Sequence, residues 1–226
     1  WQILRLLPRE MDAMDRLRTA ISALGGWDQA ANSADPEQDR QSGFRVIAQS
    51  ATIVANLLRV AEGGEPNLPD PRRSYPENFL WMITGREPSP AEVRAFDQTL
   101  IAYAEHELPN STFAARVIAS TLADLYGALT GAVASLKGPL HGGANEAVME
   151  MLLEAGDEDG LERLIREKLA RKERIMGFGH RVYMRRMDPR AQLLKETLAQ
   201  LVAEKGDPEG EKLVRMCQRG EDVMRQ

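Results

Sequence analysis

Apolar residues recur through most of the chain at the three- and four-residue spacing of amphipathic helices. One run comprises Met14, Leu17, Ile21 and Leu24 and ends at Gly25–Gly26. A second apolar stripe, ended by Gly63–Gly64, comprises Phe44, Ile47, Val54, Leu58 and Ala61. The pattern predicts a chain built mainly of helices that each carry one apolar face.

Capping residues followed by proline mark the start of three further helices. Ser89-Pro90-Ala91-Glu92 is a capping box with proline at the first helical position, and Asp188–Pro189 and Asp207–Pro208 open two helices in the same way. Residues 64–76 contain four prolines and are predicted to form a loop. No segment shows a convincing strand alternation, and aromatic residues make up only 5% of the chain. The predicted fold class is therefore all-α.

The most apolar stretch runs from Val117 to Leu136 and is long enough to be misread as a membrane span. It contains Asp124 and several hydroxyl side chains, which disfavour that interpretation. It also contains small residues suited to close packing: Ala119, Ala123, Gly127, Ala128 and Gly131. We therefore expect a buried central helix and no membrane partner.

Composition narrows the class of protein further. The 226 residues are 43% hydrophobic and 28% charged, with a net charge of -5, which is typical of one large globular domain or parts of two. Interspersed charges of both signs argue against a nucleic-acid partner but allow a local basic pocket. The single cysteine, Cys217, cannot form an internal disulfide, and together with a charged N-terminus this favours a cytoplasmic protein. The absence of an initiator methionine and of a helix stop near Gln226 indicates an excerpt of a longer protein.

Three histidines stand in loops suited to chemistry, and histidine is the side chain that titrates nearest neutral pH. His141 lies between Gly138–Pro139 and Gly142–Gly143, just before an amphipathic helix. The positive end of a helix disfavours imidazolium, and a neutral imidazole can donate a hydrogen bond to a carbonyl that becomes an enol. The alternative is that His141 merely caps the helix.

His180 follows Gly177-Phe178-Gly179, and cations lie on both sides of it. A glycine loop flanked by arginines suits a phosphate or carboxylate ligand, although a basic run is often only a solvated helix end. The loop lacks the third glycine and the preceding strand of a dinucleotide fingerprint, and no Gly-x-Ser-x-Gly elbow accompanies His141. The wide histidine spacing makes a zinc site a weak alternative, so no metal or resident cofactor is expected. His106 alone could be a structural residue at a helix end.

Taken together, the histidine loops resemble the citrate synthase family, which includes 2-methylcitrate synthases. The resemblance rests on Gly138-Pro-Leu-His-Gly-Gly-Ala-Asn-Glu146, Gly177-Phe-Gly-His-Arg-Val-Tyr183 and Asp188-Pro-Arg190, in this order and spacing. The segments 15–25, 104–106 and 111–117 are also similar to the family. The resemblance implies a citrate-synthase-like multi-helix fold, with residues 1–136 in a large helical domain and residues 137–226 forming most of a small one. It also implies a homodimer when the protein has its full length.

The same resemblance implies the chemistry. The enzyme would be an acyltransferase that condenses acetyl-CoA with oxaloacetate and water to give citrate and CoA, with the CoA thioester as substrate and no further cofactor. His141 would stabilise the enol, and His180 would polarise the oxaloacetate carbonyl and protonate the alkoxide. Oxaloacetate would be held by His106, His180 and Arg190, and Thr112 would hydrogen-bond His141. The CoA adenine would lie along Arg174, Ile175, Met176, Gly177, Phe178 and Gly179.

Two departures from the family pattern affect these expectations. The segment from His180 to Arg190 has one residue more than the family pattern, so Arg185 or Arg186 could take the carboxylate-binding role instead. The family also needs a catalytic aspartate in a later Asp-Phe motif, which residues 1–226 do not contain, so this chain alone is expected to lack activity. Alternatives are a 2-methylcitrate synthase that uses propionyl-CoA, a relative that runs the lyase direction, and a non-catalytic paralogue that binds ligand or acts in assembly.

Overall fold

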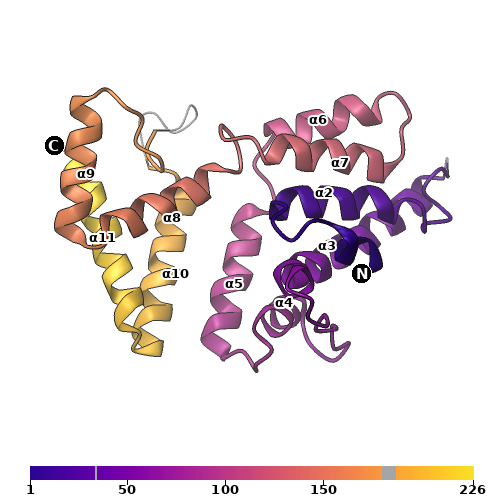
Figure 1. The fold of residues 1–226 in the computed structure, drawn as a ribbon, viewed down its shortest axis with the longest axis horizontal. Coiled ribbons are helices and arrows are strands. Elements are labelled where there is room, and N and C mark those ends of the chain that lie inside the picture. Colours follow the sequence, from indigo (N-terminus) through magenta and orange to yellow (C-terminus); the bar gives the residue numbers. More distant parts are fainter. Residues whose placement is uncertain (34, 180–186) are drawn as a thin grey trace. The chain divides into compact units, whose positions relative to one another are not determined.

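A computed structural model describes residues 1–33, 35–179 and 187–226 of the chain. Within these ranges the regular secondary structure is helical, with helices α1 to α11 and no strand (Figure 1). The all-α prediction is confirmed. The predicted helix starts are also confirmed, because α5, α10 and α11 begin at the three prolines that follow capping residues, Pro90, Pro189 and Pro208.

The helices form two compact units. Unit 1 comprises Trp1–Ser89 and His106–His141, and unit 2 comprises Pro90–Glu105 and Gly142–Gln226. Unit 1 contains α1 (Gln2–Leu6), α2 (Ala13–Leu24), α3 (Pro36–Ala61), α4 (Tyr75–Thr84), α6 (Asn110–Ala119) and α7 (Leu125–Leu136). Unit 2 contains α5 (Pro90–Tyr103), α8 (Ala144–Ala155), α9 (Glu158–Ala170), α10 (Pro189–Lys205) and α11 (Pro208–Met224). The chain thus passes between the units three times, and the domain boundary inferred after residue 136 stays a prediction.

Helix α2 lies at the centre of unit 1, beside α3 on one side and α7 on another (Figure 1). Its first apolar stripe lies inward, since Ile21 is buried with Tyr126 of α7 and Val46 of α3. The second stripe does not form the buried face of its helix, because four of its five members are exposed: Phe44, Ile47, Val54 and Leu58. The 26-residue α3 carries two apolar faces, and the one that packs on the other helices contains Val46, Ile53, Leu57 and Val60.

The stretch from Val117 to Leu136 is a pair of helices and not the single helix expected from its sequence. Helix α6 ends at Ala119, Leu122 adopts a left-handed conformation with φ of 62°, and α7 begins after Asp124, whose carboxylate accepts a hydrogen bond from the Gly127 amide. The two helices run side by side (Figure 1). Close packing through a small residue is nevertheless present, because a β-carbon on Gly131 would overlap the Ile118 side chain.

Membrane-spanning potential, judged by length and composition, is found in one helix of the described residues. That helix is α3, and 33% of its apolar window is buried. Helix α7 has only 12 residues. A single such helix is weak evidence, because the core helices of soluble proteins share these properties.

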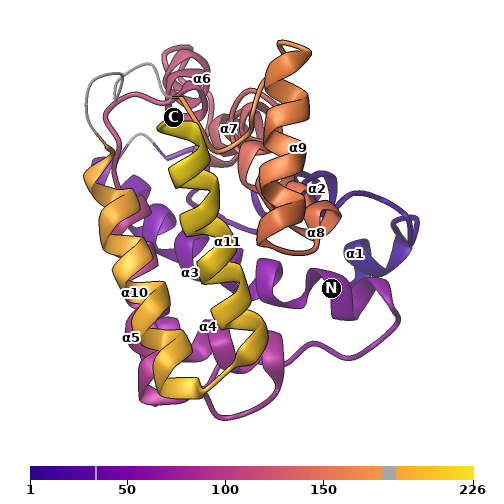
Figure 2. The same ribbon diagram turned by 90° about the vertical axis from the view of Figure 1, so that its left-hand side faces the viewer.

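In unit 2, helices α9 and α11 pack together, and α10 connects to α11 by a tight turn and lies beside it (Figure 2). The core contains Met151, Leu152, Leu161, Ile165, Ile175, Met216 and Val223. Helix α5 is held on α10 by a part-buried hydrogen bond from Thr197 to Gln98 and by the ion pairs Arg94–Glu204 and Lys205–Glu92. These contacts explain why α5 groups with helices that follow it by almost a hundred residues.

Candidate functional site

His141 stands at the end of a short, internally hydrogen-bonded loop that follows α7. Lys137 caps α7, the Gly138 amide donates to the Ser135 carbonyl, and the His141 amide donates to the Gly138 carbonyl at 2.9 Å. Helix α8 begins at Ala144, which confirms the predicted helix start just beyond His141. The loop is therefore a hydrogen-bonded turn that fixes the backbone of His141 relative to the end of α7.

Ser111, in the first turn of α6, holds the imidazole of His141. Its hydroxyl lies 2.9 Å from Nε2 of His141, and its backbone amide donates to the same nitrogen at 3.2 Å. A backbone N–H can only donate, so Nε2 must offer its lone pair, and the ring proton is assigned to Nδ1. Ser111 therefore presents a neutral imidazole whose N–H donor is Nδ1, the form that enol stabilisation requires.

Ser111 is a residue that the sequence reasoning missed. The sequence favoured Thr112, whereas the hydroxyl that reaches His141 in the structure is that of its neighbour; Thr112 itself is exposed. Successive residues on a helix point about 100° apart, so the choice between Ser111 and Thr112 depends on the position of α6 relative to the loop. Nothing in the local sequence indicates that position.

Lys137 forms a second unpredicted contact near His141. Its Nζ lies 2.6 Å from Oδ2 of Asp15 and 3.5 Å from Oδ1 of Asp12, both at the N-terminal end of α2. The hydrogen bond to Asp15 raises the pKa of the Lys137 ammonium, which therefore stays charged at neutral pH. Lys137 thus connects the base of the His141 loop to the central helix of unit 1.

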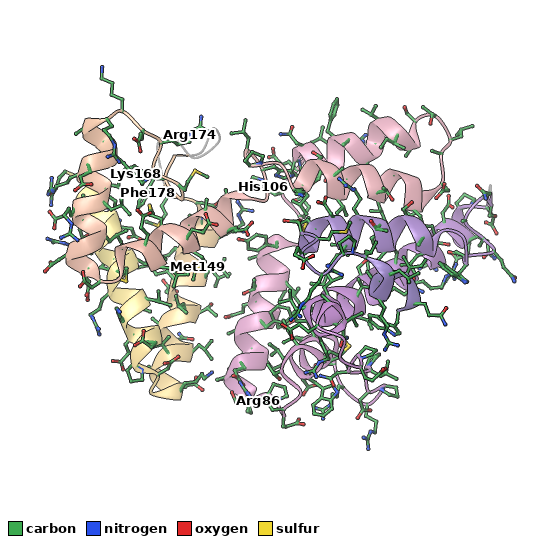
Figure 3. The ribbon with its side chains drawn as sticks, in the orientation of Figure 1. Arg86, His106, Met149, Lys168, Arg174 and Phe178 are labelled. Carbon is green, nitrogen blue, oxygen red and sulfur yellow. The ribbon has the colours of Figure 1, made fainter. Side chains whose placement is uncertain are left out.

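His106 lies in the connection between α5 and α6 and is partly buried; it is the first residue of the second segment of unit 1 (Figure 3). The next residue, Glu107, has a left-handed conformation with φ of 60°. Two of the three crossings between the units thus fall directly beside a predicted site histidine, one before His106 and one after His141.

Arg190 occupies the first turn of α10, next to the capping residue Asp188. Its guanidinium binds the Asp188 carboxylate through two nitrogens, with Nη2 2.6 Å and Nε 3.1 Å from Oδ2. The side chain therefore already holds a carboxylate in the forked geometry that a dicarboxylate ligand would need. His180, Arg185 and Arg186 lie outside the described residues.

The predicted CoA loop is anchored to the core of unit 2 by two of its own side chains. Ile175 is buried, and Phe178 packs beside it near α9 and α11 (Figure 3). Gly177 and Gly179 have positive φ of 85° and 82°, and a β-carbon on Gly177 would lie 2.9 Å from the Val148 side chain. Because its side chain is buried, Ile175 can offer a ligand mainly main-chain atoms, whereas Phe178 is partly buried and Arg174 is exposed.

The cations before this loop are partly neutralised by one carboxylate. Glu173 lies 2.7 Å from Arg171 and 3.7 Å from Lys168. Lys168 extends from the last turn of α9, and Arg174 extends from the start of the loop (Figure 3). Among the described residues, no group of three histidine, cysteine or acidic side chains is arranged to hold a metal ion.

Comparison with known proteins defines the class to which this fold and these loops belong. The family described as citrate synthase, C-terminal domain, matches residues 1–226, and the chain belongs to the citrate synthase family. It is 52% identical over 225 residues to the citrate synthase of Heyndrickxia coagulans, covering 100% of this chain and 60% of that protein. It is also 52% identical over 223 residues to the citrate/2-methylcitrate synthase of Bacillus subtilis (strain 168), covering 99% of this chain and 59% of that protein.

A solved structure agrees with this assignment. The citrate synthase of Thermoplasma acidophilum, in a ternary complex with carboxymethyl coenzyme A and oxaloacetate, superimposes with a TM-score of 0.89 at 36% identity. The match covers 98% of this chain and 57% of that one. The predicted family and its multi-helix fold are therefore confirmed, and the chain spans about 60% of the length of these relatives.

Proposed function

We propose that the full-length protein containing this chain condenses acetyl-CoA with oxaloacetate and water to give citrate and CoA. The observation that carries the proposal is the contact between Ser111 and His141, which leaves Nδ1–H of a neutral imidazole as donor. Family membership and the ligands named for the Thermoplasma acidophilum complex support the choice of substrates.

In this proposal His141 donates its Nδ1–H hydrogen bond to the thioester carbonyl while a carboxylate base removes a proton from the acyl α-carbon. The negative charge that develops on the carbonyl oxygen is stabilised by this donor, which is already in place before the reaction. The enol carbon then attacks the keto carbon of oxaloacetate, and His180 gives a proton to the alkoxide. Water finally cleaves the thioester, releasing citrate and the CoA thiol. The carboxylate base belongs to the family motif that residues 1–226 do not contain.

Oxaloacetate is held by His106, His180 and Arg190. The forked contact between Arg190 and Asp188 supports this role, because the guanidinium is oriented for bidentate carboxylate binding. Asp188 would have to yield or share the guanidinium when a substrate carboxylate binds. Arg185 and Arg186 are the alternatives.

The CoA adenine lies along residues 174–179. Gly177 and Gly179, which both have positive φ, leave the main chain uncovered by a β-carbon at these two positions, and the buried Ile175 fixes the loop on unit 2. Arg174 adds an exposed cation for an anionic ligand.

We also propose that the full-length protein is a homodimer and that it is located in the cytoplasm. The presence of a single cysteine in residues 1–226 supports the cytoplasmic location.

A second candidate function uses propionyl-CoA in place of acetyl-CoA. It is favoured by the relative from Bacillus subtilis (strain 168), which is named a citrate/2-methylcitrate synthase. The two acyl groups differ by one methylene, which a pocket discriminates by only about 10–200-fold. Relative rates, and not mere activity, therefore distinguish the two functions.

The test is a thiol-release assay on the full-length protein with oxaloacetate and either acetyl-CoA or propionyl-CoA, with the product identified by mass spectrometry. Citrate or 2-methylcitrate formation at a rate dependent on both substrates supports the proposal, and the ratio of kcat/KM values assigns the acyl donor. Binding of oxaloacetate without thiol release from either thioester would instead favour the non-catalytic paralogue.

A further inference from the structure

We propose that Lys137 is a positioning residue for His141, acting through its ion pairs with Asp15 and Asp12; its effect on turnover rests on the function proposed above. Lys137 ends α7 and stands four residues before His141, and its ammonium lies 2.6 Å from Asp15 and 3.5 Å from Asp12. The link joins the base of the His141 loop to a helix distant in sequence.

The anchor at the other end of this link is rigid. Asp12 caps α2 and accepts hydrogen bonds from the Met14 and Asp15 amides. The residue after Asp15, Arg16, is 2% exposed, and its guanidinium donates to the carbonyl oxygens of Leu4, Pro8, Arg9 and Met11. The first turn of α2 is thus held by hydrogen bonds both to its own cap and to the preceding chain. Lys137 therefore binds to a helix end that is itself fixed in position.

The loop between Lys137 and the imidazole transmits this constraint. Amide hydrogen bonds from Gly138 to Ser135 and from His141 to Gly138 close two successive turns. At the far end, Ser111 holds Nε2 through its amide and its hydroxyl. If Lys137 moves, we therefore expect the loop to shift and the His141 ring to move away from Ser111. Loss of the contacts with Ser111 would change the preferred tautomer of the ring.

A purely stabilising role predicts a different outcome. Lys137 and Asp15 have side chains that are 37% and 25% exposed, and ion pairs at such positions contribute little to the free energy of unfolding. If Lys137 only stabilised the fold, its removal would leave the His141 ring unchanged. The positioning role instead predicts a change in the ring and in kcat with little change in thermal stability, because small misplacements of a reacting group cost on the order of 10²-fold in rate.

The experiment compares Lys137→Met with Lys137→Arg in the full-length protein. The control is Arg5→Met, which removes an exposed ion pair of similar length, Arg5 to Glu65 at 2.7 Å in the same unit. Each variant is labelled with ¹⁵N-histidine, and the two ring-nitrogen resonances report the His141 tautomer without any substrate. Single substitution of each histidine assigns the resonances, and residues 1–226 contain only three.

We expect Lys137→Met to lose the Nδ1–H tautomer signature and to lower kcat about 10- to 100-fold, with an unchanged KM for oxaloacetate. Lys137→Arg should retain both the Nδ1–H tautomer signature and the kcat of the unaltered protein, since a guanidinium can reach the same carboxylates. Arg5→Met should change neither. An unaltered His141 spectrum in a folded Lys137→Met protein would overturn the proposal. Because that spectrum needs no turnover, it separates failure of this inference from failure of the proposed condensation.

Discussion

The carbonyl oxygen of Ala155, at the C-terminal end of α8, fills the space that a β-carbon on Gly160 of α9 would need. The Gly160 amide also takes part in the cap of α9, donating to the Asp157 carboxylate at 2.7 Å. The blocking atom belongs to the backbone, so it cannot move aside as a flexible side chain could. The close approach of α8 and α9 in unit 2 therefore depends on a residue without a side chain.

We expect Gly160→Ala to destabilise the protein by about 1–3 kcal/mol, because the new methyl group forces the two helix ends apart. Gly43 provides a matched control, since it lies inside α3 and a methyl group there would meet no atom within 4 Å. Gly43→Ala should be stabilising by about 0.5–1 kcal/mol through helix propensity alone. Urea unfolding of both variants checks the pair, and equal effects would contradict the steric argument.

Replacing His141 by alanine should abolish turnover but leave oxaloacetate affinity intact. The proposed role of the ring lies on the thioester side, and loss of acid catalysis and enol stabilisation should lower kcat by about 10²–10⁴-fold. Thiol release under saturating substrate, combined with calorimetry of oxaloacetate binding, measures both quantities. A variant with weak oxaloacetate binding and near-normal turnover would show that the role is assigned wrongly.

Arg190→Ala should weaken oxaloacetate binding by about 2–5 kcal/mol, because a bidentate contact to a substrate carboxylate is lost where it is desolvated. Arg185→Ala and Arg186→Ala are the natural comparisons, and His106→Ala should also weaken binding. Calorimetry of all four variants in the full-length protein determines which arginine binds the dianion. Unchanged affinity in Arg190→Ala would move the role to one of its neighbours.

A partly buried carboxylate, that of Asp28, predicts how the stability of unit 1 depends on pH. Asp28 accepts hydrogen bonds from the Tyr126 and Ser42 hydroxyls, both at 2.7 Å, and from Arg45 at 3.0 Å. The bond from Tyr126, followed by that from Ser42, holds the Asp28 pKa far below its usual value although burial opposes this. The stabilisation is therefore fully present above the unfolded pKa of about 3.9 and is lost as the pH falls toward the folded value.

Asp28→Asn should consequently lose part of the rise in unfolding free energy that the unaltered protein shows between about pH 2 and pH 5. Tyr126→Phe should cost about 1–3 kcal/mol at pH 7, since it removes the hydrogen bond from a buried hydroxyl to a charged carboxylate. Denaturant unfolding at several pH values tests both. Parallel stability curves for Asp28→Asn and the unaltered protein would mean that Asp28 does not supply this pH dependence.

Local signals in the sequence predicted local structure well, whereas contacts between distant segments could not be predicted from it. The proline-marked helix starts at Pro90, Pro189 and Pro208 were confirmed because a cap and a fixed φ act within one turn. The exposed stripe on α3 was not recognised, since a helix with two apolar faces gives no indication of which one its neighbours cover. The break at residues 120–124 was missed because only Asp124 marks it.

The candidate site divides in the same way. The glycine-flanked histidine loops could be found from motif and spacing, which identified the family. Ser111 and Lys137 could not, because their partners lie 30 and 122 positions away and depend on how α6, α7 and α2 pack. His180, Arg185 and Arg186 lie outside the described residues, so their roles stay predictions.

The pairing of α5 with α10 has a consequence for synthesis of the protein. Gln98 emerges from the ribosome 99 residues before Thr197, the residue that will bond to it. At about 5–20 residues per second, that interval lasts about 5–20 s. During this time the side of α5 that will be buried on α10 stays uncovered in the nascent chain, while its sequence neighbours can already assemble. The contact between α5 and α10 in unit 2 can therefore form only after the chain has been synthesised as far as Thr197.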